Sequence, residues 1–165
     1  MKKRIIALGL LWCLSAVMLQ AARVDTVLVR SAAMNKDVKV VYVLPDKAIG
    51  KQACPVVYLL HGYGGNARSW VQLKPELPQM ADEKGIIFVC PDGKNSWDWD
   101  SPENPAYRYE TFVTSELVKY TDGNYATIPD RKARAISGLS MGGHGALWSA
   151  IRHKDVFGAA GSMSG

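Results

Sequence analysis

Residues 134–153, RAISGLSMGGHGALWSAIRH, decide the fold of this chain. Arg134 to Ser137 predicts a short strand, and Leu139 to His153 predicts a turn that leads into a helix rich in small residues. Between these two elements stands Gly138-Leu139-Ser140-Met141-Gly142, which matches the pattern G-x-S-x-G. A strand, a tight turn and a helix in this order predict that the serine hydroxyl stands exposed above the end of a sheet.

The two outer glycines of this motif have a physical reason. At Gly138 and Gly142 a side chain would collide with the neighbouring strand and helix, and the small residues that follow extend this close contact. A chance match in a glycine-rich loop is the alternative interpretation, and the flanking strand and helix argue against it. Ser140 is therefore the candidate nucleophile.

A second motif, His61-Gly62-Tyr63-Gly64-Gly65, directly follows the apolar run PVVYLL at 55–60. The sharp turn that carries such a serine is called the nucleophile elbow. In folds that contain it, a loop that follows an earlier strand supplies one backbone N–H to an oxyanion hole, and the residue after the nucleophile supplies the other. We therefore expect donors at Met141 and Tyr63, with Gly62 as the alternative to Tyr63. A plain strand-to-helix turn would also explain the glycines, but the two motifs in this order favour an oxyanion hole.

None of the three histidines is a good general base for Ser140. His61 comes too early for the chain order serine, acid, histidine, so we expect its imidazole to fix the oxyanion loop. His144 lies on a helix from which the serine points away, and His153 lies at the negative end of that helix dipole. Asp155 is the only acidic residue after the serine. A serine without a base is a weak nucleophile.

Strands alternate with helices along the rest of the chain. The segments expected as strands are 24–30, 38–44, 55–60, 86–90 and 158–163, those expected as helices lie within 68–84 and 109–120, and 45–54 is expected as a loop. The first two strands predict an antiparallel hairpin, and the continuous apolar runs are typical of strands buried on both faces of a parallel sheet. The fold class is therefore α/β, with a mostly parallel sheet and flanking helices.

The first residues predict a secretory signal peptide at 1–22, which leaves the folded domain at 23–165. A basic start at 2–4 is followed by an apolar run from Ile5 to Leu19 and then by two alanines. The run is shorter than the roughly 20 residues that span a bilayer. We therefore expect a secreted or periplasmic protein without a stable membrane anchor after cleavage.

The cysteines carry little chemistry. A lipoprotein signal is an alternative for Cys13, but Trp12 stands where a small residue would precede a lipidated cysteine. We expect Cys54 and Cys90 near opposite ends of neighbouring parallel strands, too far apart for a disulfide. Both are therefore expected as free, buried thiols.

Charge and composition argue against nucleic-acid and metal partners. The formal net charge is +5, and removal of the three cations of the signal segment leaves +2. We find no Lys/Arg-rich stripe for phosphates, and no His/Cys cluster that suggests a metal. We expect no nucleic acid, no metal and no cofactor.

An aromatic stretch, Trp97-Asp98-Trp99-Asp100, follows the strand IIFVC together with Tyr107 and Tyr109. The loop lies at the carboxyl side of a parallel sheet, where ligands bind in such folds. These rings could contact a sugar or an acyl chain. A loop anchored by buried tryptophans is the alternative interpretation.

With these motifs placed, the chain resembles the esterase family that includes tributyrin esterase, S-formylglutathione hydrolase, feruloyl and acetylxylan esterases, and mycolyltransferases. The segments YLLHGYGGNARSW at 58–70 and SGLSMGGHGAL at 137–147 are closest to the tributyrin esterase branch, and the resemblance runs from about residue 24 to residue 165. It implies an α/β-hydrolase fold with Ser140 as nucleophile and with Tyr63 and Met141 as oxyanion donors.

The resemblance also implies that the triad acid and histidine lie on later strands and loops. The chain would then cover about six strands of eight, as a fragment with an open sheet edge that lacks esterase activity alone. The implied reaction is hydrolysis of a small-molecule or carbohydrate ester through an acyl-enzyme, without a cofactor. Acyl transfer to a sugar, as in mycolyltransferases, and a non-catalytic binding remnant are the alternatives.

Overall fold

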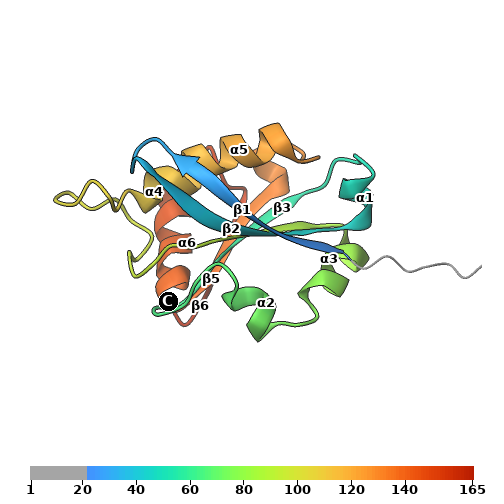
Figure 1. The fold of residues 1–165 in the computed structure, drawn as a ribbon, viewed down its shortest axis with the longest axis horizontal. Coiled ribbons are helices and arrows are strands. Elements are labelled where there is room, and N and C mark those ends of the chain that lie inside the picture. Colours follow the sequence, from blue (N-terminus) through green and yellow to red (C-terminus); the bar gives the residue numbers. More distant parts are fainter. Residues whose placement is uncertain (1–21) are drawn as a thin grey trace, which may run out of the picture.

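The computed structural model describes residues 22–165, so the predicted signal peptide at 1–22 lies outside the described residues except for Ala22. The described part is built on one six-stranded sheet with the order β1-β2-β4-β3-β5-β6 (Figure 1). The strands are β1 (Arg23–Ser31), β2 (Lys36–Leu44), β3 (Val56–Leu60), β4 (Ile87–Pro91), β5 (Arg134–Leu139) and β6 (Ala159–Met163).

Strand directions confirm the predicted α/β class. β1 and β2 form the expected antiparallel hairpin, and β2 pairs antiparallel with β4. β4, β3, β5 and β6 are parallel, so their carboxyl ends meet at one edge of the sheet. In the register of β3 with β5, Leu60 lies beside Gly138, which brings the two glycine-rich motifs together at that edge.

Helices cover both faces of the sheet (Figure 1), with α4, α5 and α6 on one side and α2 and α3 on the other. The helices are α1 (Asp46–Ile49), α2 (Ser69–Leu73), α3 (Leu77–Lys84), α4 (Tyr109–Thr111), α5 (Leu117–Asn124) and α6 (Met141–Arg152), with a π turn at Phe112–Glu116 and a 3₁₀ turn at Arg131–Ala133. Strand β2 shows the two-sided burial: Val40 and Tyr42 pack with one group of helices, and Val41 and Val43 pack with the other.

The helical segments differ from the sequence-based expectation in detail. The segment 45–54 was expected as a loop, but Pro45 precedes the single turn α1, because its fixed φ suits the start of a helix. The crossover helix within 68–84 was expected to be interrupted by Pro75 and Pro78; it is interrupted at Pro75, but Pro78 lies in the first turn of α3, where a missing N–H costs nothing. The expected helix at 109–120 contains the π turn.

The state of the two cysteines agrees with the expectation from the sequence. Cys54 precedes β3 and Cys90 lies near the end of β4, and both are free and buried. Burial raises the pKa of the Cys90 thiol to about 12, so it stays protonated at neutral pH.

A buried ion pair anchors the strand that carries the candidate serine. Arg134 begins β5 and is 7% exposed. Its Nη2 donates to Asp122 Oδ2 at 2.6 Å, and its Nη1 donates to the carbonyl of Val156 at 3.0 Å.

Replacement of Asp122 by Asn leaves the Arg134 charge in its buried position without a carboxylate. We expect the D122N variant to lose about 3–5 kcal/mol of unfolding free energy, measured by urea denaturation. D37N removes the carboxylate of an exposed pair with Arg30, in which the side chains are 58% and 53% exposed, and should cost less than about 1 kcal/mol. Equal small losses in both variants would contradict the buried anchor.

Candidate active site

Ser140 stands on a strained turn between β5 and α6. Its backbone has φ 53° and ψ −116°, which residues with a side chain seldom adopt and which costs about 1–3 kcal/mol. Its N–H donates to the carbonyl of Met163 on β6 at 2.7 Å, and its carbonyl accepts the N–H of His144 at 3.0 Å. Ser140 is exposed at the carboxyl edge of the sheet. The turn thus presents the hydroxyl to solvent.

The glycines of the motif allow the turn to pack against β3. A Cβ atom on Gly142 would lie 2.4 Å from the carbonyl oxygen of Leu60 and 2.7 Å from that of His61. A Cβ atom on Gly138 would lie 2.2 Å from the carbonyl oxygen of Gly142. All three separations are shorter than the non-bonded contacts that real Cβ atoms make, so no side chain fits at either position.

The second glycine-rich motif lies against this turn. A Cβ atom on Gly62 would lie 3.8 Å from Cβ of Ser140. Tyr63 follows, with its side chain 66% exposed. Met141 is the first residue of α6, and its N–H is one of the helix's four N-terminal N–H groups that lack an intrahelical acceptor. The two segments that carry the expected oxyanion donors therefore meet at Ser140.

His61 connects the expected oxyanion loop, residues 61–65, to the loop after β4. The side chain is buried, its Nδ1 lies 2.8 Å from the carbonyl oxygen of Gly62, and its Nε2 accepts the N–H of Gly93 at 3.0 Å. Burial lowers the pKa of His61, but Asp92 and the Gly62 carbonyl outweigh this, and the pKa lies above its usual value. Protonation of Nε2 would exchange the Gly93 hydrogen bond for an ion pair with Asp92 Oδ1, which lies 3.7 Å away.

The other two histidines have partners away from the serine. His144 Nδ1 lies 3.1 Å from the carbonyl oxygen of Trp97. His153 Nε2 lies 2.8 Å from Glu110 Oε1, a contact that joins residues 43 apart and leaves no signal in the sequence. Among residues 22–165, no histidine side chain forms a hydrogen bond with Ser140, as the chain order suggested.

Within residues 22–165, no three His, Cys, Asp or Glu side chains are grouped so that they could hold a metal ion. In the same part of the chain, none of the helices has the length and apolar character needed to cross a bilayer.

Residues 31–165 match the model of the family described as "Putative esterase". The chain belongs to this esterase family. An acetyl esterase of Caldicellulosiruptor saccharolyticus is 27% identical over 135 residues, which cover 77% of this chain and 50% of that protein. The MPT51/MPB51 antigen of Mycobacterium tuberculosis is 32% identical over 153 residues, which cover 88% of this chain and 46% of the antigen.

Solved structures show the same fold. A ferulic acid esterase is 30% identical, with a TM-score of 0.72, and the match covers 86% of this chain and 59% of that esterase. The family resemblance and the α/β-hydrolase fold expected from the motifs are therefore confirmed. The chain spans about half the length of the curated relatives that it matches.

Two residues of the loop after β4, Gly93 and Asn95, contact the candidate site, and no sequence pattern identified them. Besides the Gly93 bond to His61, Oδ1 of Asn95 accepts the N–H of Gly64 at 2.8 Å. The one sign of Gly93 and Asn95 in the sequence is that they follow shortly after a buried strand. Because β3 lies between β4 and β5, these two hydrogen bonds hold the oxyanion loop from the side opposite β5.

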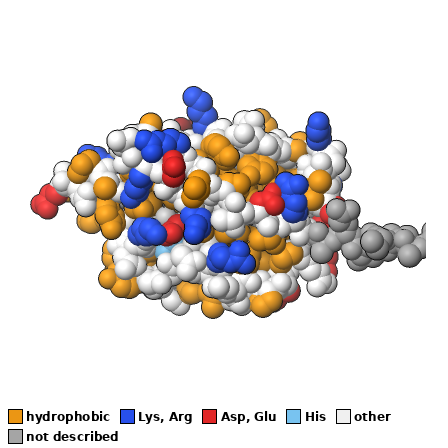
Figure 2. Space-filling model, viewed as in Figure 1, with side chains coloured by type: hydrophobic (Ala, Val, Ile, Leu, Met, Phe, Trp, Pro, Cys, Tyr) orange, Lys and Arg blue, Asp and Glu red, His pale blue; other side chains and the backbone are white. Residues whose placement is uncertain are grey.

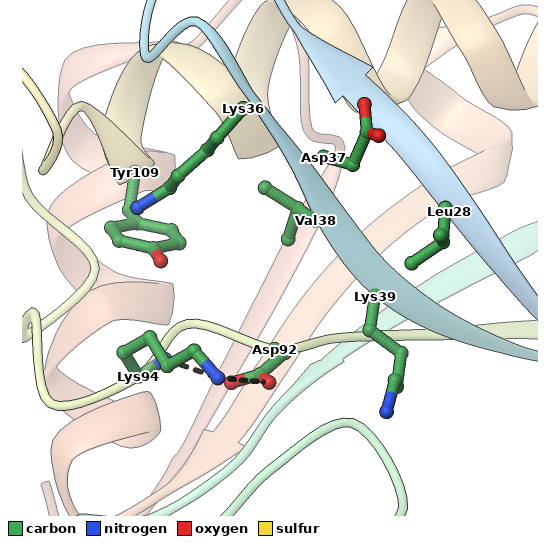
Figure 3. A pocket seen from close by; sticks show the side chains of 8 residues that line it. All are labelled: Leu28, Lys36, Asp37, Val38, Lys39, Asp92, Lys94 and Tyr109. Carbon is green, nitrogen blue, oxygen red and sulfur yellow. Dashed lines mark hydrogen bonds and ion pairs between the residues drawn. The ribbon is translucent and has the colours of Figure 1, made fainter.

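Asp92 places a fixed negative charge behind the oxyanion loop. Burial raises the pKa of Asp92, but the polar contact with His61 Nε2 at 3.7 Å and the hydrogen bonds from Lys94 outweigh this and hold the pKa well below its usual range. Asp92 also lines a hollow of about 240 Å³ between β2 and the loop after β4, in which its Oδ2 pairs with Lys94 Nζ at 2.8 Å (Figure 3). Figure 2 shows the Lys and Arg side chains of this face as separate groups among acidic and apolar ones.

Asp98 is a buried carboxyl group against α6. It is 2% exposed, and its Oδ2 has no hydrogen-bond partner within the described residues. A Cβ atom on Gly145 would lie 2.6 Å from Oδ2, so the carboxyl group occupies the space above that glycine. Burial raises the pKa of Asp98 to about 7.

Substitution of a single glycine tests the close contact between elbow and oxyanion loop. We expect G142A to prevent native packing, because the new methyl group would overlap the main chain of Leu60 and His61. Gly123 is the matched control: it lies in α5 and has no atom within 4 Å of its Cβ position, so G123A should gain about 0.5–1 kcal/mol. Circular dichroism and thermal unfolding distinguish the variants, and a fully native G142A would contradict the packing.

The burial of Asp98 predicts a pH dependence of stability. The folded-state pKa of about 7 lies above the ordinary value of 3.8, so the neutral carboxyl group stabilises the fold below about pH 4. This stability is lost progressively as the pH rises from about 4 through about 7, by up to about 4 kcal/mol. Urea unfolding at pH 4, 6 and 8 should show this loss relative to D98N, which does not titrate. A difference between the two proteins that is constant with pH would refute the prediction.

Proposed function

We propose that this chain carries the nucleophile and the oxyanion hole of a secreted or periplasmic serine esterase. One observation supports the proposal above all others: the exposed Ser140 stands on a positive-φ turn, against the Gly62 loop and the first N–H of α6. This is the geometry that acyl transfer through a serine needs. Membership of the esterase family agrees with it.

In the proposed reaction, Ser140 Oγ attacks the carbonyl carbon of a carboxylic ester and loses its proton to a base. Negative charge then develops on the former carbonyl oxygen, and the backbone N–H groups of Met141 and Tyr63, or Gly62 in its place, stabilise it. The C–O bond to the alcohol breaks and leaves an acyl-enzyme, which water hydrolyses. Because these donors belong to the main chain, they are oriented before the substrate binds.

The base is proposed to come from outside residues 22–165. The described histidines are engaged with Gly62 and Gly93, with Trp97, and with Glu110. The relatives are about twice as long as the match, which leaves room for an acid and a histidine in the whole protein. Residues 23–165 alone are then expected to lack turnover.

The substrate is proposed to be a small-molecule or carbohydrate ester, since relatives are named acetyl esterase and ferulic acid esterase. Acyl transfer to a sugar hydroxyl would use the same elbow and donors, with a sugar in place of water. A non-catalytic binding remnant is the remaining alternative. A reading frame that continues past Gly165 into a late acid and histidine favours the enzyme, and a stop codon there favours the remnant.

Hydrolysis of 4-nitrophenyl acetate tests the nucleophile. In the protein extended by its own reading frame, S140A should lower kcat by at least about 10³-fold, because no other group forms the acyl-enzyme. The matched control is L73A, which changes an exposed side chain on α2 and should leave kcat unchanged. Turnover that survives S140A would contradict the role of Ser140, and robust Ser140-dependent turnover by residues 23–165 alone would contradict an external base.

A further inference from the structure

The loop after β4 holds two tryptophans at the surface. Trp97 is 47% exposed and Trp99 is 45% exposed, so the alternative interpretation of this loop, anchorage by buried tryptophans, is wrong. Two large apolar rings exposed on one loop commonly mark a binding surface.

A network of contacts holds these rings in place. The carbonyl oxygen of Trp97 lies 3.1 Å from His144 Nδ1, and the two rings meet edge to face at 5.5 Å. His144 stacks on Trp148 at 6.0 Å, and Trp99 meets the same indole edge to face at 6.3 Å. Trp148 Nε1 donates to the buried Glu110 at 2.7 Å. Because the rings are held before any ligand arrives, a ligand that stacks on them does not have to order them.

Two hollows of different character share the tryptophan pair. One, of about 300 Å³, is lined by Trp97, Trp99 and His144. The other, of about 290 Å³, is also lined by both indoles, and its remaining lining residues are polar and uncharged: Asn95, Ser96, Ser101, Asn104 and Tyr107. The pair therefore has an apolar side and a side rich in amides and hydroxyls.

Two amides of the polar hollow keep donors for a ligand. Oδ1 of Asn95 accepts the N–H of Gly64, and Oδ1 of Asn104 accepts the N–H of Ala106 at 3.0 Å. These contacts orient both amides, so that each Nδ2 group is left to donate; no hydrogen bond from either is present among residues 22–165.

Indole faces beside uncharged amides and hydroxyls suit a neutral pyranose. The C–H face of such a sugar packs on an aromatic ring, and its hydroxyls need hydrogen-bond partners at the ring's edge. An aromatic acyl group would use the apolar hollow but would leave the amides without partners. A charged ligand finds no opposite charge among the residues that line either hollow.

The tryptophan pair and its two hollows adjoin the candidate catalytic serine. Asn95 contacts the oxyanion loop at Gly64, and His144 is bonded through its N–H to the carbonyl of Ser140. We propose that Trp97 and Trp99, together with Asn95 and Asn104, bind a neutral pyranose, so that the ester hydrolysed at Ser140 is an ester of a carbohydrate. This substrate class rests on the proposed function, whereas sugar binding itself does not require catalysis.

Tryptophan fluorescence of S140A protein titrated with xylohexaose tests the subsite without turnover. We expect saturable binding that W99A weakens about tenfold, the equivalent of about 1.4 kcal/mol of lost stacking. N104D keeps the oxygen that accepts from Ala106 but removes the Nδ2 donor, and should weaken binding about three- to tenfold. L73A serves as the control for an exposed apolar side chain distant in sequence and should bind as S140A alone does.

The outcomes separate the two proposals. Absence of xylohexaose binding, or binding unchanged by W99A and N104D, overturns the subsite. Binding of ferulate without binding of xylohexaose also overturns it, in favour of an aromatic acyl pocket. Sugar binding in a protein whose ester hydrolysis does not depend on Ser140 would support the subsite while the esterase proposal fails.

Discussion

The main chain of Leu60 and His61 occupies the space where a side chain on Gly142 would stand. This contact packs the turn after β5 against the end of β3 with no room for a side chain between them. It also stabilises the positive φ of Ser140, which by itself costs about 1–3 kcal/mol. Without it, neither the exposed hydroxyl nor the neighbouring N–H groups would have a defined position.

Three loops at the carboxyl edge of the sheet depend on that contact. The oxyanion loop is hydrogen-bonded through His61 and Gly64 to the loop after β4, and the elbow holds it from the other side. Asp92 lies behind this loop and is ionised across the pH range in which proteins are folded, because hydrogen bonds from Lys94 hold its pKa low. Charge and hydrogen bonds thus orient a segment whose glycines give it little stiffness of its own.

Helix α6 connects this edge to the rest of the domain. Its first turn carries the N–H of Met141, and its outer side carries His144 and Trp148, which support the exposed tryptophans. Burial raises the pKa of Glu110, but hydrogen bonds from Trp148, Arg152 and His153 outweigh this and lower it, so the carboxylate stays charged. One buried carboxylate therefore links the end of α6 to the segment that contains the π turn.

Much of the fold and part of the candidate site could be predicted from the amino-acid sequence. The opening hairpin, the buried parallel strands and the two free thiols follow from local patterns, because apolar runs and turn residues act over a few neighbouring positions. The pairing of the two glycine-rich motifs could also be predicted, since the carboxyl ends of neighbouring parallel strands share an edge. The single turn α1 and the π turn could not, because short segments depend on packing rather than on periodicity.

Local residue patterns were sufficient to predict that a serine stands on a sharp turn beside a second glycine-rich loop. Which side chains support that arrangement became visible only in the folded chain. Asp92 and His61 are 31 residues apart in the chain, and Glu110 and His153 are 43 apart, so no short-range pattern connects them. Exposure of Trp97 and Trp99 was equally undetermined, because the same residues could have been buried. Contacts between distant segments depend on strand order and loop path, which the chain settles only when it folds.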